Sequence, residues 1–418
     1  MSSEPRGAGS GTGRIRWPVL ALALVACADA RDTAGAPAVT AIEPLGSPAG
    51  AHSSEPNLAV DARGRVHMTW HERASGSAYA LRYSILDGAA WTAPRTIVER
   101  SDFFKNWADF PSVHVTRTGR VLVHWLQRSG SGRYTYDVRI AQSSDDGVSW
   151  STPAVLNRDG VPAEHGFVSL FAAEGDSVEA VWLDGRKTVN AGPSRAMQLA
   201  TTRIGPDGGF GVERMLDTRI CDCCQTSAAL TPRGAVVVYR DRSADEVRDI
   251  AIVRRVAGEW TEPALVHADN WQIAACPVNG PSVAARGDTV AVAWFTGAQD
   301  TARVRVAFSA DAGATFSPPI RVDDGQPAGR VDVEFDDKGR ALVSWLERSG
   351  GENAEVRLRA VQRSGTLSPS VRVAASSAGR PSGFPQMVRR GPELVIAWTV
   401  PGDTSRVHVA VSRLSRGE

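Results

Sequence analysis

The sequence predicts an all-β fold, a seven-bladed β-propeller of four-stranded antiparallel blades. The first observation is a set of seven aromatic residues spaced by 55, 57, 57, 55, 51 and 53 residues. The second is a glycine that stands five to seven residues before each of them. The third is the alternation of side chains around that glycine, as in 66–70 (VHMTW) and 341–345 (ALVSW). A hairpin pattern that returns at a period of this length indicates an array or a propeller.

Each repeat also supplies a third and a fourth strand. Examples are the third strand at 136–143 (YDVRIAQS) and the fourth strand at 92–98 (TAPRTIV). Four antiparallel strands repeated around a closed ring leave few open sheet edges. The seven aromatic residues are Trp70, Trp125, Trp182, Tyr239, Trp294, Trp345 and Trp398. Tyr239 holds the place that Trp takes elsewhere, so we assign it to the core rather than to catalysis.

The last repeat lacks a fourth strand, because the sequence stops soon after its third strand at 406–414. A strand-like segment without a partner, 39–46 (VTAIEPLG), stands near the other end. We expect this N-terminal strand to pair with the last blade and close the ring. A six-bladed ring is the alternative architecture.

The charge balance argues against a polyanionic partner. The 418 residues include 47 Lys and Arg against 46 Asp and Glu, a formal net charge of +1, and no basic run. We therefore exclude nucleic-acid binding. Separately, we expect the chain to be a monomer.

The N-terminal residues form a targeting pattern. Three arginines (Arg6, Arg14 and Arg16) precede the apolar stretch 18–26, and Cys27 follows at once. The stretch is too short to span a bilayer but suits a secretory signal. The tetrad 24–27 (LVAC) resembles a bacterial lipobox, whose cysteine is lipidated. We expect a signal peptide over 1–27, a flexible tether over 28–37 and one propeller domain over 38–418.

This pattern implies an exported lipoprotein of the cell envelope, periplasmic or at the cell surface, that contacts the membrane through its lipid alone. A signal peptide with an incidental cysteine is the alternative.

Two segments, 143–150 (SSDDGVSW) and 309–316 (SADAGATF), match the Asp-box pattern Ser-x-Asp-x-Gly-x-Thr/Ser-Trp/Phe. In such a turn the aspartate accepts backbone N–H bonds, the glycine takes a positive φ and the aromatic ring packs between strands. These residues are Asp145, Gly147 and Trp150, and Asp311, Gly313 and Phe316. The chain thereby resembles the Asp-box (BNR) repeat, sialidase-like propellers.

The resemblance implies a carbohydrate ligand, and an exo-sialidase-type glycoside hydrolase as the enzymatic alternative. Two features depart from true sialidases. The Phe/Tyr-Arg-Ile-Pro motif is missing, with 54–60 (SEPNLAV) in its place, and the repeats number seven where sialidases have six blades.

Loops that enter the first strand of a blade share one face with loops that join its second and third strands. On that face we expect interleaved arginines and carboxylates, which suit a carbohydrate or another polar or anionic small ligand. The candidates are Glu55, Arg73, Asp109, Arg128, Asp184, Arg186, Arg240, Asp241, Arg242, Arg330 and Asp332. Two readings stay open beside ligand binding: a salt-bridge lattice between blades, and glycosidase acid–base chemistry.

Four cysteines converge in the repeat frame. Cys221 and Cys276 each stand 18 residues before a frame aromatic residue, and Cys223 and Cys224 follow the first of them. Three interpretations remain: two disulfides, a thiolate site for Cu(I) or Zn(II), and redox-active thiols. His267 and Asp222 are close enough in sequence to assist a metal. A fourth role for the whole chain is that of a scaffold in an envelope complex.

Overall fold

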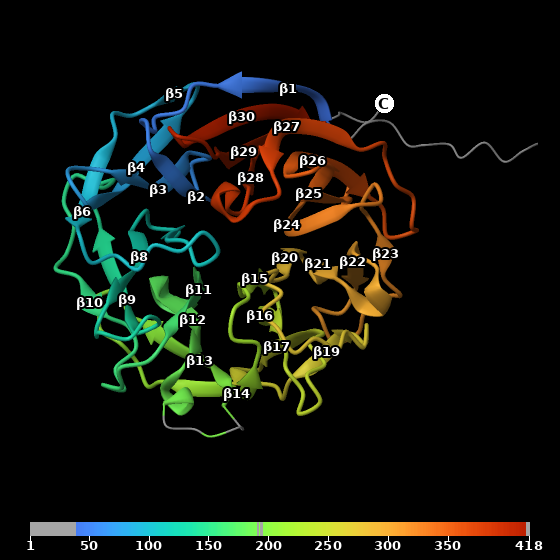
Figure 1. The fold of residues 1–418 in the computed structure, drawn as a ribbon, viewed down its shortest axis with the longest axis horizontal. Coiled ribbons are helices and arrows are strands. Elements are labelled where there is room, and N and C mark those ends of the chain that lie inside the picture. Colours follow the sequence, from blue (N-terminus) through green and yellow to red (C-terminus); the bar gives the residue numbers. More distant parts are fainter. Residues whose placement is uncertain (1–38, 190–191, 193–194, 415–418) are drawn as a thin grey trace, which may run out of the picture. The chain divides into compact units, whose positions relative to one another are not determined.

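The computed structural model describes residues 39–189, 192 and 195–414. The predicted signal peptide, its Cys27 and the tether lie outside the described residues. Within them, seven antiparallel sheets follow one another around a central axis, as Figure 1 shows. The prediction of seven four-stranded blades is therefore confirmed, and the six-bladed alternative is wrong. Among the described residues, no helix has the length and apolar character needed to cross a bilayer.

The innermost strand of each blade lines the axis. These strands are β2 (Ser53–Val60), β7 (Ser112–Val115), β11 (His165–Ala172), β15 (Ser227–Thr231), β20 (Ser282–Arg286), β24 (Pro327–Phe335) and β28 (Gln386–Arg390). The second strands carry the frame aromatic residues. They are β3 (Val66–Arg73), β8 (Val121–Arg128), β12 (Val178–Asp184), β16 (Gly234–Arg240), β21 (Thr289–Thr296), β25 (Ala341–Gly350) and β29 (Glu393–Val400).

The third strands are β4 (Tyr79–Asp87), β9 (Tyr136–Ser143), β13 (Met197–Ile204), β17 (Ile250–Val256), β22 (Arg303–Ser309), β26 (Asn353–Val361) and β30 (Arg406–Leu414). Outer strands, several of only two residues, complete blades 1 to 6 at the rim. They are β5 (Ala90–Trp91), β6 (Arg95–Arg100), β10 (Ala154–Val155), β14 (Arg214–Ile220), β18 (Glu259–Trp260), β19 (Ala264–His267), β23 (Ile320–Arg321) and β27 (Val371–Ser377). Four 3-10 turns lie in loops: η1 (Glu174–Asp176), η2 (Arg186–Thr188), η3 (Ala298–Asp300) and η4 (Arg380–Ser382).

The core lies between the blades. Buried apolar side chains of the described residues form seven clusters, each shared by two neighbouring blades and each holding one frame aromatic residue. Six of these rings are at most 1% exposed, and Trp398 is 7% exposed. Because both faces of a blade pack against neighbours, the second strands are buried almost without interruption. Truncating such a ring to alanine costs about 3–5 kcal/mol in folded cores. Tyr239 belongs to this core, as expected.

The ring closes through the N-terminal strand β1 (Val39–Leu45), which pairs antiparallel with β30 of the last blade. Figure 1 shows β1, in blue, beside the red strand β30. Register pairs include Glu43 with Val411 and Leu45 with Val409. The predicted closure by an N-terminal strand is confirmed. Without β1, the outer edge of β30 would be unpaired.

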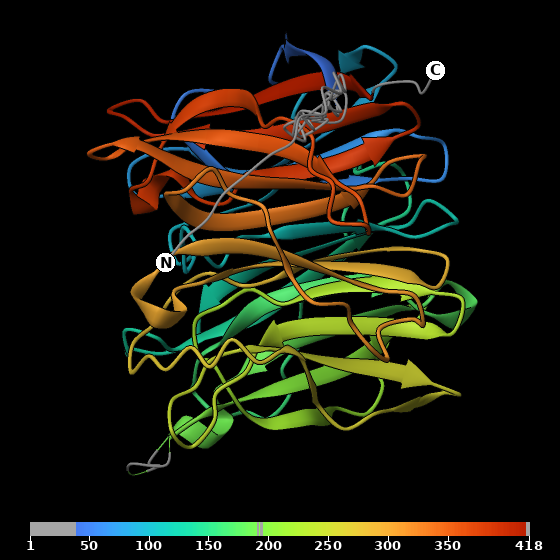
Figure 2. The same ribbon diagram turned by 90° about the vertical axis from the view of Figure 1, so that its right-hand side faces the viewer.

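The direction of the strands gathers the loops at two ends. Figure 2 shows the strands of the blades running roughly along the axis down which Figure 1 looks. Loops that lead into innermost strands therefore share one end with loops that join second to third strands. We call this end the entry-loop face. The turns at 143–150 and 309–316 join third to fourth strands, at the opposite end.

The two opposite-end turns have the same hydrogen bonds. Asp145 Oδ1 accepts from the backbone N of Ser149 at 2.9 Å, and Asp311 Oδ1 accepts from that of Thr315 at 2.9 Å. Gly147 and Gly313 have φ values of 81° and 79°. A Cβ on Gly147 would lie 2.4 Å from the ring of Tyr83, so close packing and backbone conformation both require glycine there.

We expect a chain that begins at residue 46 to melt about 5 °C or more below one that begins at residue 38. Removing β1 exposes the edge of β30 and deletes several hydrogen bonds together with the packing of Ile42 and Leu45. Circular dichroism during heating measures both chains. Equal melting temperatures would mean that β1 does not close the ring.

Candidate functional site

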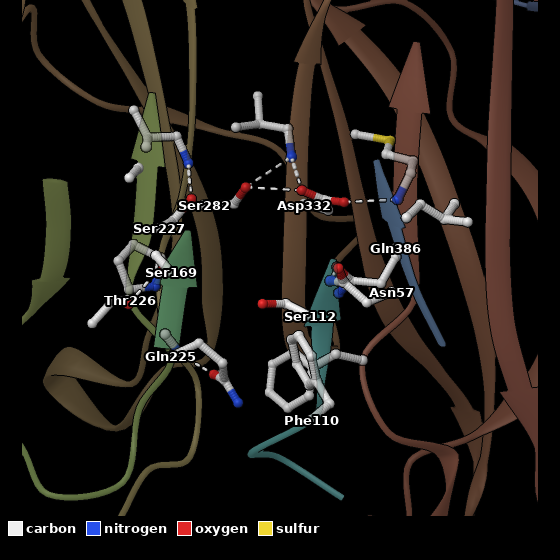
Figure 3. A pocket seen from close by; sticks show the side chains of 18 of the residues that line it. Asn57, Phe110, Ser112, Ser169, Gln225, Thr226, Ser227, Ser282, Asp332 and Gln386 are labelled. Atoms are coloured by element: carbon white, nitrogen blue, oxygen red, sulfur yellow. Dashed lines mark hydrogen bonds between the residues drawn. The ribbon is translucent and has the colours of Figure 1, made fainter. Parts of the chain in front are cut away.

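A narrow polar channel runs between the innermost strands, with a volume of about 260 Å³. Each blade contributes one polar side chain at the same register, 12 or 13 residues before its frame aromatic residue. Figure 3 shows these side chains around the channel: Asn57, Ser112, Ser169, Ser227, Ser282, Asp332 and Gln386.

Polar side chains of the inner strands hold neighbouring blades together. Asn57 Oδ1 accepts from the backbone N of Val113 at 3.0 Å, and Asp332 Oδ2 accepts from that of Met387 at 2.8 Å. At four of the remaining junctions Asp109, Ser227, Ser282 and Thr399 likewise accept from a backbone N–H group of the next blade, whereas at the fifth the hydroxyl of Thr226 donates to the carbonyl of Phe167. Because these polar groups already take part in hydrogen bonds between blades, few of them remain free to bond a ligand in the channel.

Two carboxyl groups in the channel share one strand. Burial raises the pKa of Asp332 to about 6. Burial, together with the neighbouring Asp332, raises the pKa of Glu334 to about 8. Glu334 is therefore mostly protonated at pH 7.

A second group of carboxyls lies on the entry-loop face, between blade 2 (β7–β10) and blade 3 (β11–β14). The Tyr136 hydroxyl is 2.8 Å from Glu164 Oε1 and 3.3 Å from Asp109 Oδ2. Asp109 Oδ1 also accepts from the backbone N of Phe167 at 2.7 Å. Gly166 makes room for this cluster, because a Cβ there would lie 2.0 Å from Asp109 Oδ2. We call Asp109, Tyr136 and Glu164 the carboxyl cluster.

The carboxyl cluster holds protons. Burial raises the pKa of Asp109 well above its ordinary value, and Glu164 adds to this effect. Burial likewise raises the pKa of Glu164 to about 7, with a contribution from Asp222. The phenol has one proton to donate, so it can donate to Glu164 while protonated Asp109 donates to it. The arrangement can store and pass a proton near neutral pH.

Aromatic and cationic side chains border the carboxyl cluster. Phe104 stacks on Tyr136 with ring centroids 3.8 Å apart, and it also contacts Tyr134 at 6.1 Å. The ring of Tyr134 is 47% exposed. The exposed Arg128 lies 5.5 Å over Phe104, and Arg133 lies 5.3 Å over Tyr134. Of the candidate arginines, Arg128 alone is placed by these contacts beside the cluster.

Two of the candidate arginines are buried and bonded to backbone. Arg240 is 2% exposed and donates to the carbonyl oxygens of Asn279, Arg248 and Phe295. Arg330 is 5% exposed, and it donates to carbonyls such as that of Gly383. Burial lowers its pKa to about 10. Neither forms an ion pair among the described residues. Their guanidinium groups tie loops together and are not open to a ligand.

Other candidates form ion-pair networks. Arg186 contacts Asp184 at 2.7 Å, Asp159 at 2.9 Å and Glu213 at 2.8 Å. Asp184 also accepts from the indole of Trp182 at 2.9 Å, which explains why this carboxylate follows the frame aromatic residue. These bonds join side chains of blade 3 and of the loop that leads into it.

The remaining candidates differ in their exposure. Arg242 pairs with Glu246 at 2.7 Å, and Glu55 contacts His71 at 2.7 Å and Lys105 at 2.5 Å. Asp241 is half-buried, and burial raises its pKa to about 6. Arg73 is exposed.

The cysteines lie together on the entry-loop face. Cys221 and Cys224 are 1% exposed, Cys223 is half-buried and Cys276 is exposed, and all four are free thiols. The ligand atoms of Cys221, Cys223 and Cys224 lie within 4.8 Å of one another, and so do those of Asp222, Cys223 and Cys276. Among the described residues, His267 belongs to no such group.

Sequence reasoning missed Tyr134, Tyr136 and Glu164. Glu164 directly precedes the entry residue His165, so a scan one residue wider would have included it. No periodic signal marks Tyr136, which begins a third strand. The sequence analysis also did not predict the channel serines. A polar residue 12 or 13 positions before each frame aromatic residue is nevertheless a pattern that the sequence shows.

The chain matches no protein-family model and no curated protein. Solved structures do match. A protein of unknown function from Dyadobacter fermentans is 13% identical with a TM-score of 0.53, over 91% of this chain and 100% of that one. A polysaccharide lyase is 11% identical with a TM-score of 0.54, over 87% and 90%. An α-L-arabinofuranosidase from Fusarium graminearum is 12% identical with a TM-score of 0.50, over 90% and 98%.

A sialidase from Streptococcus pneumoniae also matches, at 12% identity with a TM-score of 0.44, over 90% of this chain and 70% of that one. At such identities the likeness shows a shared fold alone, and the resemblance to sialidase-like propellers stays a prediction from the sequence.

Proposed function

We propose that this chain is an exported, lipid-anchored, monomeric propeller that recognises a carbohydrate at the corner between blades 2 and 3 of its entry-loop face. The observation that carries the proposal is the carboxyl cluster bordered by an exposed aromatic ring and two exposed arginines. An exposed tyrosine offers a flat apolar surface with a polar tip, which suits the face of a sugar ring. Arg128 and Arg133 supply donors for hydroxyl or carboxylate oxygens. The fold, shared with carbohydrate-processing enzymes, is consistent with such a ligand but does not define it.

The corner is a better candidate than the channel. In the channel, polar side chains are engaged in bonds between blades, and the volume is small for anything beyond a single sugar. At the corner, Tyr134 lies in a loop and Arg128 lies at the end of a strand. Within the described part of the chain, neither side chain forms a hydrogen bond that joins two blades. A ligand there would also reach Glu164, which is half-buried.

Glycan-array binding tests this proposal. We expect Tyr134→Ala and Arg128→Gln each to weaken binding about tenfold or more, which corresponds to a loss of about 1.4 kcal/mol. Arg73→Gln is the matched control, because Arg73 is an exposed arginine at the same strand end of blade 1. Absence of glycan binding by the unaltered chain, or equal binding by all variants, would contradict the proposal.

A second candidate function is glycoside hydrolysis, favoured by the proton-holding pair Asp109 and Glu164. A carboxyl with a pKa near 7 is protonated often enough at neutral pH to serve as a general acid, and Asp109 would serve as the paired base or nucleophile only after it loses its own proton. The rate should then fall as pH rises through about 7, because Glu164 loses its proton.

A panel of chromogenic glycosides, sialosides included, measures that activity. We expect Glu164→Gln to lower the rate about 10²- to 10⁴-fold and to abolish the fall above pH 7. Arg73→Gln should leave both rate and pH profile unchanged. If the unaltered chain releases no chromophore from any substrate, recognition without hydrolysis is the surviving function.

The anchor has its own test. We expect Cys27→Ala to move the protein from the detergent phase to the aqueous phase in Triton X-114 partition and to remove incorporation of labelled palmitate. The basis is the lipobox-like tetrad at 24–27. Unchanged partition and labelling in the variant would exclude lipidation at Cys27.

A further inference from the structure

Four sulfur atoms gather where the entry loops of blade 4 (β15–β19) and blade 5 (β20–β23) meet. Cys221 Sγ lies 3.7 Å from Cys223 Sγ and 3.6 Å from Cys224 Sγ. Cys223 also belongs to the group that contains Cys276 and Asp222, so it connects the two loops. Two buried sulfurs form the inner side of the group, and the exposed Cys276 forms its outer side.

The separations among the sulfurs of Cys221, Cys223 and Cys224 fit a shared metal ion, whereas Cys276 is grouped with Cys223 and Asp222 and is the outermost of the four ligands. A tetrahedral thiolate centre with metal–sulfur bonds of about 2.3 Å has sulfur–sulfur edges of about 3.8 Å. The edges at Cys221, 3.6 and 3.7 Å, are close to that value. They are well above the roughly 2.05 Å of a disulfide bond. A disulfide, moreover, joins sulfurs in pairs, whereas Cys221 lies equally close to two others.

A buried cation favours the thiolate form at this place. Arg248 is 3% exposed, and its Nη1 lies 3.3 Å from Cys221 Sγ and 3.1 Å from Asp222 Oδ1. Its Nη2 is held by Glu246 at 2.8 Å. A guanidinium aimed at sulfur stabilises a thiolate, the form that binds metals, and a neutral disulfide sulfur would gain little from it.

We propose that Cys221, Cys223, Cys224 and Cys276 bind one thiophilic d10 ion, Zn²⁺ or Cu⁺. Clustered thiolates select these soft or borderline ions over Mg²⁺ and Ca²⁺, which take oxygen ligands. The ion would tie the entry loops of blades 4 and 5 together at the face that holds the carboxyl cluster. None of the four ligands belongs to the corner between blades 2 and 3, so the proposal does not rest on carbohydrate recognition, although Asp222 beside the sulfurs contributes to the raised pKa of Glu164.

The full chain, purified without oxygen, provides the test. Elemental analysis should find about one Zn or Cu per chain, or the metal-free chain should take up one equivalent of Zn²⁺ or of Cu⁺ in separate anaerobic titrations. Thiol titration of the chain, denatured in the presence of a chelator, should then detect Cys221, Cys223, Cys224 and Cys276, with Cys27 as a fifth thiol where it carries no lipid. Non-reduced peptide mapping should find no cross-link. Replacement by Co²⁺ should give thiolate-to-cobalt charge-transfer absorption.

Variants separate ligands from bystanders. Cys276→Ser changes an exposed ligand and should weaken metal binding, while the variant keeps its cooperative thermal transition. Cys224→Ser changes a buried ligand and should abolish metal binding. Arg248→Gln, which keeps all four sulfurs, should weaken binding about 10- to 100-fold. His267→Ala is the matched control outside the sulfur group, and it should leave metal content unchanged.

Three results would overturn the proposal. The first is cross-linked cysteine peptides in the anaerobically purified chain without bound metal. The second is free thiols at the four positions that take up neither ion. The third is metal uptake that is unchanged in both Cys276→Ser and Cys224→Ser.

Discussion

The structure depends on the hydrogen bonds that join each innermost strand to the next blade. An innermost strand pairs with its own second strand along one edge, and its other edge carries backbone N–H groups without a sheet partner. In this ring, side chains such as Asn57, Ser227, Ser282 and Asp332 accept from those groups across the junctions. A buried N–H group left without a partner costs about 1–3 kcal/mol, so these bonds favour the closed ring over a separated pair of blades.

Closure has consequences for both proposed sites, since each is built from loops of two blades. The carboxyl cluster takes Asp109 and Tyr136 from blade 2 and Glu164 from the loop into blade 3. The sulfur group takes three cysteines from the loop into blade 4 and Cys276 from the loop into blade 5. The bond from Asp109 to the backbone of Phe167 serves the ring and the site together, because the same carboxyl group also contacts Tyr136. Activity and stability are therefore coupled at this residue.

Sequence periodicity was sufficient for the architecture. The frame aromatic residues, their turn glycines and the unpaired segment near residue 39 predicted the blades and the closing strand, because each depends on local geometry and a fixed spacing. The convergence of the cysteines followed from the same frame. What the sequence could not reveal is how far a polar side chain is already engaged. Arg240 and Arg330 stand at the predicted face, yet their donors point to backbone carbonyls, and Asp184 is bonded to Trp182 and Arg186. Tyr136 and Glu164 meet only because two blades pack, which leaves no mark in either segment.

Amide hydrogen exchange tests the role of the junction bonds most directly. The N–H groups of Val113, Val283, Val333 and Met387 bond to side chains of the preceding blade, and that of Val333 bonds to Asp332 of its own strand as well. If these bonds hold the ring closed, the four amides will exchange as slowly as those of the second strands. Rapid exchange at all four, while the second strands stay protected, would contradict the account and leave the ring to be held by its apolar clusters and β1 alone.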